Sequence, residues 1–293
     1  MILTAEWETE QTGPTVSTIR VKCREHQEWE QWVLLSADRH LDNPKTDLNM
    51  QRRHLDQAKE RNACVIDIGD LFDAMQGKGD RRSMKQDLKD EHKRNDYLGS
   101  LIREGTQFFE PYAAQLALIG TGNHESGVLK NHELDLTGQL VDRLKDKGSP
   151  VILGGYRGWI RFLFNASGKS HFRQAFKLHY NHGSGGGGPV TKGVIGTNRR
   201  ATYLPDADIV VGGHIHEAWM VEQRRARLND LGAEYSDEQV HICLPTYKDE
   251  FFGTSSGYHH ENERPPKPLG AWWLRFFYDW RAKKIKFETQ RAK

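Results

Sequence analysis

The sequence predicts an α/β protein in which two mixed β-sheets pack together and helices flank them. Two observations carry this prediction. Short apolar runs alternate with helix-compatible stretches in the first half of the chain, and strand-like runs of aromatic and β-branched residues dominate the second half. A chain of 293 residues, 37% of them hydrophobic and 10% aromatic, can bury the core that such a fold needs. Because no internal repeat or linker is visible, we predict a single domain over residues 1–293.

The predicted strands and helices follow from the length and spacing of the apolar runs. Four runs indicate buried strands: Trp32–Ser36, Ala63–Ile68, Leu116–Gly120 and Ile209–Gly212. Helices are predicted within Lys45–Asn62, Asp87–Phe109 and Asp135–Lys147, and a charged, helical insertion is expected near residues 76–110. Further strands are predicted at Trp159–Asn165, Gln174–Asn181, Val240–Leu244, Ala271–Tyr278 and Ile285–Glu288. The last two form a C-terminal β-hairpin near residues 270–290.

Composition excludes several classes of protein. Charged residues make up 28% of the chain, yet the formal net charge is only +2, so bulk charge identifies no polyanionic partner. Cys23, Cys64 and Cys243 are far apart and odd in number, which argues against a disulfide framework or a thiolate zinc site. The N-terminus lacks the features of a signal peptide, and no apolar stretch reaches the roughly 20 residues that span a bilayer. We therefore predict a cytoplasmic protein without a membrane partner.

Residues of metal-binding type follow the ends of the apolar runs. They are Asp38 and His40, Gly69-Asp70 with Asp73, Gly122-Asn123-His124-Glu125, His182, and His214 with His216. Ligands of α/β sheets gather outside the carboxyl ends of the strands, so these positions are expected to converge on one edge. Carboxylates, an amide oxygen and imidazoles together suit manganese, iron or zinc. Two such ions about 3.5–4 Å apart can stabilise the charge of a phosphoryl group under attack.

Each of these motifs also has a purely structural interpretation when it is taken alone. A D-x-H triplet is commonplace, Gly69-Asp70 is typical of a turn, and Asn123 can cap a helix. His214 and His216 can be one buried and one exposed histidine of an irregular segment. Their joint occurrence, in order and after strand-like runs, favours the metal site.

The histidine that follows the run Gln174–Asn181 has a competitor. His179 precedes His182 by three residues, and strand alternation places the two on opposite faces, so only one is expected to serve. His182 is favoured because it lies nearer the loop.

The motif series D-x-H, G-D, G-N-H-[DE], H and G-H-x-H, over residues 38–216, resembles the calcineurin-like metallophosphoesterase superfamily. The resemblance implies a four-layer α/β/β/α sandwich with two divalent ions, Mn²⁺ first and Fe or Zn as alternatives. It implies that one ion is bound by Asp38, His40 and His216, the other by Asn123, His182 and His214, and that Asp70 bridges both. His124 would contact the phosphate and protonate the leaving group, while Glu125 and Asp73 orient their neighbours.

The motifs leave the substrate open. Ala74-Met75 stands where phosphoprotein phosphatases have Arg-Gly, which argues against a phosphoprotein substrate, and Glu125 replaces the aspartate usual in the repair-nuclease branch. We predict hydrolysis of phosphodiester bonds in DNA, RNA or nucleotides. The alternatives are a small-molecule phosphomonoesterase and a non-catalytic metal- or nucleic-acid-binding module.

Other segments bear on nucleic-acid binding. Arg199-Arg200 can meet a substrate phosphate, whereas for Arg224, Arg225 and Arg227 a solvated charged face is the favoured interpretation. The aromatic residues of Ala271–Tyr278 can stack bases in principle, but their strand spacing makes core packing the stronger expectation. Gly183–Pro189 lacks the G-K-[ST] ending of a P-loop and is predicted to be a lid or connector beside the metals.

Overall fold

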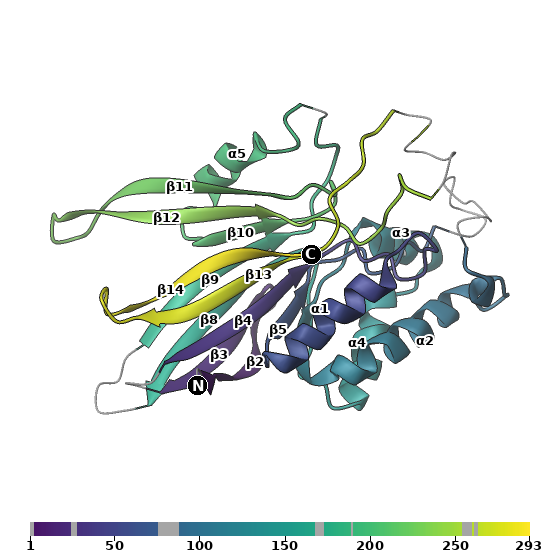
Figure 1. Cartoon of the computed structure of the whole chain (residues 1–293), viewed down its shortest axis with the longest axis horizontal. Helices are drawn as coiled ribbons and strands as arrows, with labels where there is room; N and C mark the ends of the chain where they lie inside the picture. The colour runs from purple at the N-terminus through teal and green to yellow at the C-terminus, as the bar shows by residue number, and fades with distance from the viewer. Residues whose placement is uncertain are drawn as a thin grey trace.

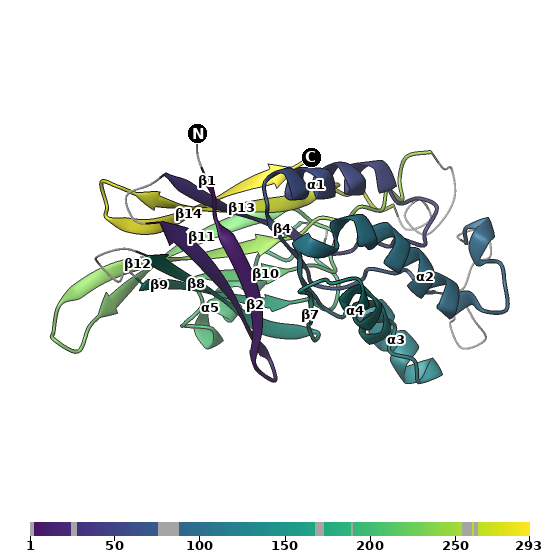
Figure 2. The ribbon, with the colours of Figure 1, turned by 90° about the horizontal axis from the view of Figure 1, so that it is seen from below.

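Two mixed β-sheets pack face to face, and helices cover the outer face of the first sheet (Figures 1 and 2). The computed structural model describes residues 3–24, 28–75, 88–167, 173–188, 190–253, 260 and 263–293. Each sheet has seven strands, in the order β14-β13-β4-β5-β6-β7 with β1 beside β4, and β11-β12-β10-β9-β8-β3-β2. The predicted fold class is confirmed.

The first sheet combines both ends of the chain. Its parallel centre consists of β4 (Trp29–Ser36), β5 (Cys64–Asp67) and β6 (Leu116–Ile119), which match three of the predicted apolar runs. Its remaining strands are β1 (Leu3–Thr4), β7 (Ile152–Leu153), β13 (Ala271–Asp279) and β14 (Lys284–Ala292). β13 pairs antiparallel with both β4 and β14, so the predicted C-terminal hairpin extends the sheet built by the first half of the chain.

Three helices cover this sheet, and each buries an apolar face against it. They are α1 (Leu48–Glu60), α2 (Tyr97–Phe109) and α4 (Leu136–Asp146). The carboxylates of Asp47 and Asp135 accept hydrogen bonds from backbone N–H groups in the first turns of α1 and α4, which explains where these helices begin. In the predicted insertion, the part that is described contains a short 3-10 helix (Asp90–His92) and α2, while residues 76–87 lie outside the described part.

The second sheet contains elements that the sequence did not predict. Its strands are β2 (Glu6–Gly13), β3 (Val16–Arg24), β8 (Arg157–Ser167), β9 (Arg173–Asn181), β10 (Ile209–Gly212), β11 (Trp219–Leu228) and β12 (Glu234–Cys243). The β2–β3 hairpin and β11 were not foreseen. Against the outer face of this sheet the described chain places one eight-residue helix, α5 (Gly196–Tyr203), so the second helical layer is small. None of the described helices has the length and apolar character that a membrane span requires.

The core between the sheets contains most of the C-terminal aromatic side chains. Trp272 and Phe276 of β13 are buried there against residues of both sheets, and Trp273 is buried on the helical side. The expectation of core packing is therefore confirmed for these rings, which cannot stack on nucleic-acid bases without unfolding the sheet.

Candidate metal centre

The predicted site residues meet at one edge of the paired sheets, in the loops that follow the carboxyl ends of the central strands. The loop after β4 is joined to the loop after β5 by hydrogen bonds from Asp38 N to Gly69 O (2.9 Å) and from His40 N to Asp70 O (3.1 Å). Ligand-type atoms form one group from Asp38, His40 and His216 and a second group from Asp70, His182 and His214; His40 also forms a group with Asp73 and His124, and the atoms of each group lie within 4.8 Å of one another. The first two groups contain residues that the resemblance assigns to the two ions, and the position of the Asn123 amide is described below.

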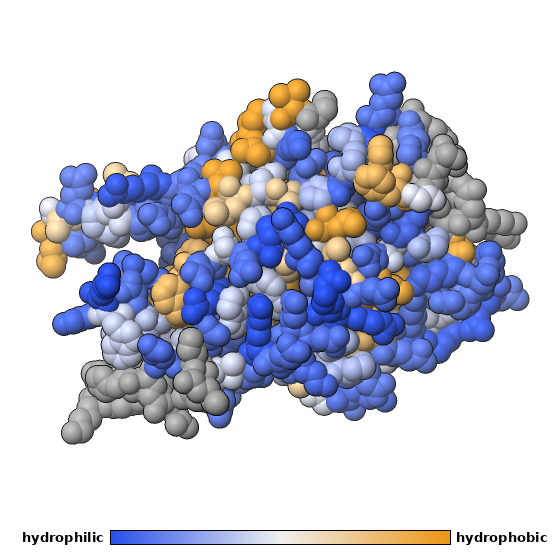
Figure 3. All heavy atoms as spheres, in the orientation of Figure 1, coloured by the Kyte–Doolittle hydropathy of each residue, from blue (hydrophilic) through white to orange (hydrophobic). Residues whose placement is uncertain are grey.

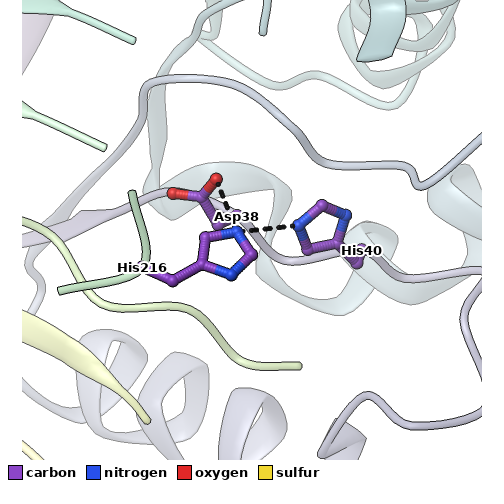
Figure 4. Close-up of side chains that lie close together, drawn as sticks. All are labelled: Asp38, His40 and His216. Atoms are coloured by element: carbon purple, nitrogen blue, oxygen red, sulfur yellow. Dashed lines mark hydrogen bonds and ion pairs between the residues drawn. The ribbon is translucent and has the colours of Figure 1, made fainter. Parts of the chain in front are cut away.

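The first group has the geometry of a cation site. The Nε2 atom of His216 lies 3.3 Å from Asp38 Oδ1 and 3.4 Å from His40 Nε2, and both contacts are drawn in Figure 4. Asp38 Oδ1 is fully buried and accepts no hydrogen bond from any described residue, whereas Oδ2 accepts the backbone N–H of His214. A buried carboxylate oxygen without a donor, facing two imidazole nitrogens, leaves room for a positive ion as its partner.

The second group leads to the same conclusion through the tautomer of one histidine. His182 Nδ1 lies 3.2 Å from the carbonyl oxygen of Ile68, which can only accept a hydrogen bond, so the proton belongs on Nδ1. The other ring nitrogen, Nε2, then points a lone pair at Asp70 Oδ2 (3.0 Å) and at Asn123 Oδ1 (3.2 Å). Three electron-rich atoms this close require a proton or a metal ion among them, and these donor types fit a divalent transition metal.

The charges of the histidines and of the Asp70 carboxylate shift one another's pKa values. Burial lowers the pKa of His182, but the carboxylate of Asp70 outweighs it and raises that pKa to about 9. Burial would raise the pKa of Asp70, yet His124, His182 and His40 together hold it well below its usual range. Since His40 belongs to the first group and His182 to the second, the Asp70 carboxylate is within electrostatic reach of both.

The structure separates the two competing histidines of β9. The His179 ring packs edge-on against Trp159, with the ring centroids 4.9 Å apart, and burial lowers its pKa to about 4. It belongs to neither group of ligand-type atoms. His182, three residues later, is completely buried beside Asp70.

His124 stands at the start of α3 (Asn123–His132), between the two groups. Its Nδ1 atom forms a hydrogen bond with the backbone oxygen of Asp73, and its Nε2 atom lies 3.6 Å from Asp70 Oδ2. The His124 side chain keeps 11% of its surface exposed.

Glu125 joins two loops of the site through its carboxylate. This group accepts hydrogen bonds from the backbone N–H groups of Gly122 (2.8 Å), Phe72 (3.0 Å) and Asp70 (3.1 Å). Burial and the charge of Asp70 raise the pKa of Glu125 to about 7, while these N–H groups favour its charged form. Glu125 therefore holds the Asp70 loop against the Asn123 loop, one of the orienting functions predicted for it.

The glycines of the G-D and G-N-H motifs are needed for close approach. Gly69 has φ +116, a conformation that side chains disfavour, and a Cβ there would lie 2.4 Å from the backbone nitrogen of Gly122. A Cβ on Gly122 would lie 2.0 Å from Asp70 Oδ1. The two loops can therefore touch, and position Asp70, only because both residues lack side chains.

The backbone of the site is strained at the ligand-type residues themselves. Left-handed φ angles occur at Asp38 (52°), His40 (46°), Asp70 (55°), His214 (71°) and His216 (55°). Asp and His tolerate this conformation better than most residues, but each still costs on the order of 1 kcal/mol. Strain concentrated in this way is typical of sites whose geometry is fixed by function and stabilised by the surrounding fold.

Two parts of the chain that support the site were not predicted from the sequence. Arg39, between Asp38 and His40, is completely buried and points away from the ligand groups toward Asp67 of β5. Thr246 and Lys248, in the segment after β12, contact the Asp38 backbone and the Asp73 carboxylate. The position of Thr246–Lys248 could have indicated that it belongs to the site, because it follows the predicted strand Val240–Leu244 as the motifs follow the other strands.

The arginines that sequence analysis associated with phosphate lie outside the two ligand groups. Arg200, on α5, reaches over Gly212 on the outer face of the second sheet. Arg225 and Arg227 of β11 form ion pairs with Asp237 of β12, and Arg224 donates hydrogen bonds to Ser236. This hairpin presents a largely hydrophilic surface (Figure 3), as a solvated charged face would.

A comparison with solved structures gives neighbours at very low identity. Neighbours include a predicted phosphoesterase from Streptococcus pneumoniae (10% identity, TM-score 0.33, 90% of each chain covered). Another is Vps29 with zinc from Entamoeba histolytica (10% identity, TM-score 0.32), and a third is a dimetal phosphatase from Danio rerio (9% identity, TM-score 0.34). Each of these two matches covers 89% of this chain and 99% of the other chain. The two packed mixed sheets with outer helices agree with the sandwich that the motif series implies.

The likeness concerns the fold alone, and activity has to be argued from the site. No protein-family model matches the sequence, and the comparison with curated proteins gives no match. What the chain itself supplies is adjoining groups of metal-type ligands at one edge of the two packed sheets.

Proposed function

We propose that the chain is a dinuclear-metal-dependent phosphoesterase that hydrolyses phosphodiester bonds of DNA, RNA or nucleotides. The observation that supports it most is the pair of ligand groups, Asp38/His40/His216 and Asp70/His182/His214, which are joined by the hydrogen bond from His214 N to Asp38 Oδ2. In this proposal Asn123 joins the second set and Asp70 bridges the two. The ions, Mn²⁺ first with Fe or Zn as alternatives, would supply positive charge that polarises the phosphoryl group.

In this proposal His124 moves the proton. Its Nδ1 is engaged by the backbone oxygen of Asp73, which fixes the Nδ1–H tautomer of the neutral ring and the orientation of Nε2. Burial lowers the pKa of His124, but the carboxylates of Asp70 and Asp73 outweigh it and raise that pKa, which favours the protonated ring. Nε2–H can then protonate the departing oxygen, a step worth about 10²–10⁴-fold in rate.

The charge around the site favours a diester over a monoester. A diester carries one negative charge at neutral pH, and a monoester carries close to two. Among the described lysines and arginines, Arg39 pairs with Asp67, and Lys248 pairs with Asp73 and Glu250. Neither of these two cations is free to balance the second charge of a monoester.

A paired assay tests the proposal. With Mn²⁺ present, bis-p-nitrophenyl phosphate should be cleaved with a higher kcat/KM than p-nitrophenyl phosphate. His124→Ala should lower kcat by about 10²-fold or more, whereas His132→Ala, at the exposed end of the same helix, should not change it. Faster cleavage of the monoester would support the phosphomonoesterase alternative.

One further variant separates an enzyme from a binding module. Asp70→Asn should abolish hydrolysis, because it removes a ligand from both sets. If this variant keeps full activity, the assignment of Asp70 is wrong. If the wild-type chain binds Mn²⁺ but cleaves none of these esters, labelled DNA or cyclic nucleotides, the non-catalytic alternative replaces the enzyme.

The proposed location is cytoplasmic. Cys23, Cys64 and Cys243 are all unpaired and buried, and free thiols are typical of reducing compartments. Fractionation of cells that produce the protein would test this location directly.

A further inference from the structure

The segment Thr246–Lys248 crosses the edge of the sheets beside the first ligand group. The Thr246 hydroxyl and the Tyr247 N–H both donate hydrogen bonds to the backbone oxygen of Asp38, at 2.9 and 3.1 Å. Lys248 forms a β-bridge with Thr46, just after the D-x-H loop. The backbone from which the Lys248 side chain extends is therefore fixed relative to the Asp38–His40 turn.

The Lys248 ammonium lies between two carboxylates in the interior. Its Nζ atom is 3.1 and 3.3 Å from the two oxygens of Asp73 and 3.2 Å from Glu250 Oε1. Only 6% of the side chain is exposed. The N–H groups of the Lys248 ammonium are directed at the carboxylates of Asp73 and Glu250. Lys248 can therefore influence the metal centre through Asp73.

Asp73 touches both histidines whose orientation the reaction needs. Its Oδ1 atom lies 2.9 Å from His40 Nδ1, and its backbone oxygen bonds His124 Nδ1. Its other carboxylate oxygen accepts a hydrogen bond from Asn43 Nδ2 at 2.6 Å. A carboxylate this close to one ring nitrogen of a histidine favours the ring orientation in which the opposite nitrogen faces the metal.

We infer that Lys248 is a positioning residue of the metal centre, acting through Asp73 on His40 and His124. With the ammonium in place, the Asp73 carboxylate keeps one orientation, His40 presents Nε2 to the metal, and His124 presents Nε2 to the phosphate. Without it, the carboxylates of Asp73 and Glu250 would face each other in the interior with no cation between them and would move apart. The inference rests on the proposed function and identifies a residue that none of the motifs contains.

Lys248→Met tests this inference, because methionine keeps most of the side-chain length and removes the charge. Calorimetric titration should show one of the two Mn²⁺ sites weakened about 10-fold or more, the range for partners that orient metal ligands. For bis-p-nitrophenyl phosphate we expect kcat to fall about 10-fold with KM nearly unchanged. Lys248→Arg should restore most of both properties, since it retains a cation at the same place. Lys286→Met, which removes an exposed partner of Asp279, is the matched control and should change neither.

A double-mutant cycle separates action through Asp73 from an independent role. If Lys248 acts through Asp73, then Lys248→Met should cost little more once Asp73→Asn is present. An equal loss of Mn²⁺ affinity in both backgrounds would overturn the inference. So would unchanged Mn²⁺ affinity in Lys248→Met, or a rise in KM alone, which would indicate direct substrate contact.

If circular dichroism shows that the Lys248→Met variant does not fold, Lys248→Gln replaces it.

The inference and the proposed function can fail separately. If the wild-type chain binds Mn²⁺ and cleaves no ester, the proposed function fails, while the Mn²⁺ affinities of the same variants still decide the role of Lys248.

Discussion

Replacing Arg39 should show how strongly the interior of the protein supports the D-x-H turn. The guanidinium of this residue is completely buried. It donates hydrogen bonds to Asp67 Oδ2 (2.7 Å), Ser36 Oγ (2.9 Å) and Gln51 Oε1 (3.0 Å). Its carbon lies 5.0 Å from the ring centroid of Tyr247, within the range of a cation–π contact.

Arg39→Met keeps the apolar stem and removes the charge, so Asp67 becomes a buried carboxylate without a cation. Removing one partner of a buried ion pair costs about 3–5 kcal/mol, a large part of the roughly 5–15 kcal/mol that stabilises a typical domain. The expected loss in the free energy of unfolding is therefore about 3–5 kcal/mol. Asp67→Asn in the same chain should recover part of this loss, since no unpaired carboxylate remains.

Guanidinium chloride unfolding of the metal-free proteins, followed by circular dichroism, measures these differences. The control is Arg20→Met, which removes the partner of Glu10 in a half-exposed pair. Its expected cost is about 0–1 kcal/mol. If Arg39→Met costs no more than this control, or if the Asp67→Asn effect is simply additive, the reasoning is refuted.

Three further predictions concern the glycine contact, a buried histidine and metal removal. Gly122→Ala should abolish binding of at least one Mn²⁺ in calorimetry, because the added Cβ would lie 2.0 Å from Asp70 Oδ1; unchanged binding would contradict the contact. Burial lowers the pKa of His54 to about 4 from 6.5, so the unfolded chain holds more protons between these values. The contribution of His54 to the free energy of unfolding should therefore be full above about pH 6.5 and fall by up to about 3 kcal/mol toward pH 4. His54→Leu should flatten this dependence in pH-resolved denaturation, and an unaltered slope would show that His54 is not its source. A chelator should lower the Tm and stop hydrolysis, both reversibly on adding Mn²⁺, and full activity in excess chelator would contradict a metal requirement.

The strands that support the site could be predicted because they are buried on both faces. Trp32–Ser36 and Ile209–Gly212 are nearly continuous apolar runs, and each is followed directly by residues of the metal-binding type. Helix Leu136–Asp146 was equally clear, since its apolar positions follow the helical period and Asp135 caps it.

Elements with weak burial could not be predicted in the same way. Strand Glu6–Gly13 lies at the edge of the second sheet and buries little, so its polar sequence carries no strong period-two signal. Trp219–Leu228 is also an edge strand, and its arginines suggested only a charged face. Both are stabilised by pairing with a neighbouring strand, Val16–Arg24 and Glu234–Cys243, which a single sequence does not reveal.

The residues of the site also differ in how far the sequence predicts them. Asp38, Asp70 and His214 follow strand ends in recognisable motifs, and the structure brings them together. The residues that support the site have roles that no local sequence pattern indicates. Arg39 is turned toward Asp67, and Lys248 reaches Asp73 from a distant segment. Such long-range ion pairs depend on the folded geometry, so their partners become visible only in three dimensions.

Anomalous diffraction from crystals grown with Mn²⁺ would test whether the site holds two metal ions. Two peaks about 3.5–4 Å apart are expected, one beside Asp38, His40 and His216, the other beside Asn123, His182 and His214, with the Asp70 carboxylate between them. A single peak at this edge would contradict the shared site. So would Mn²⁺ bound only at the separate cluster of Glu91, His92 and Glu104.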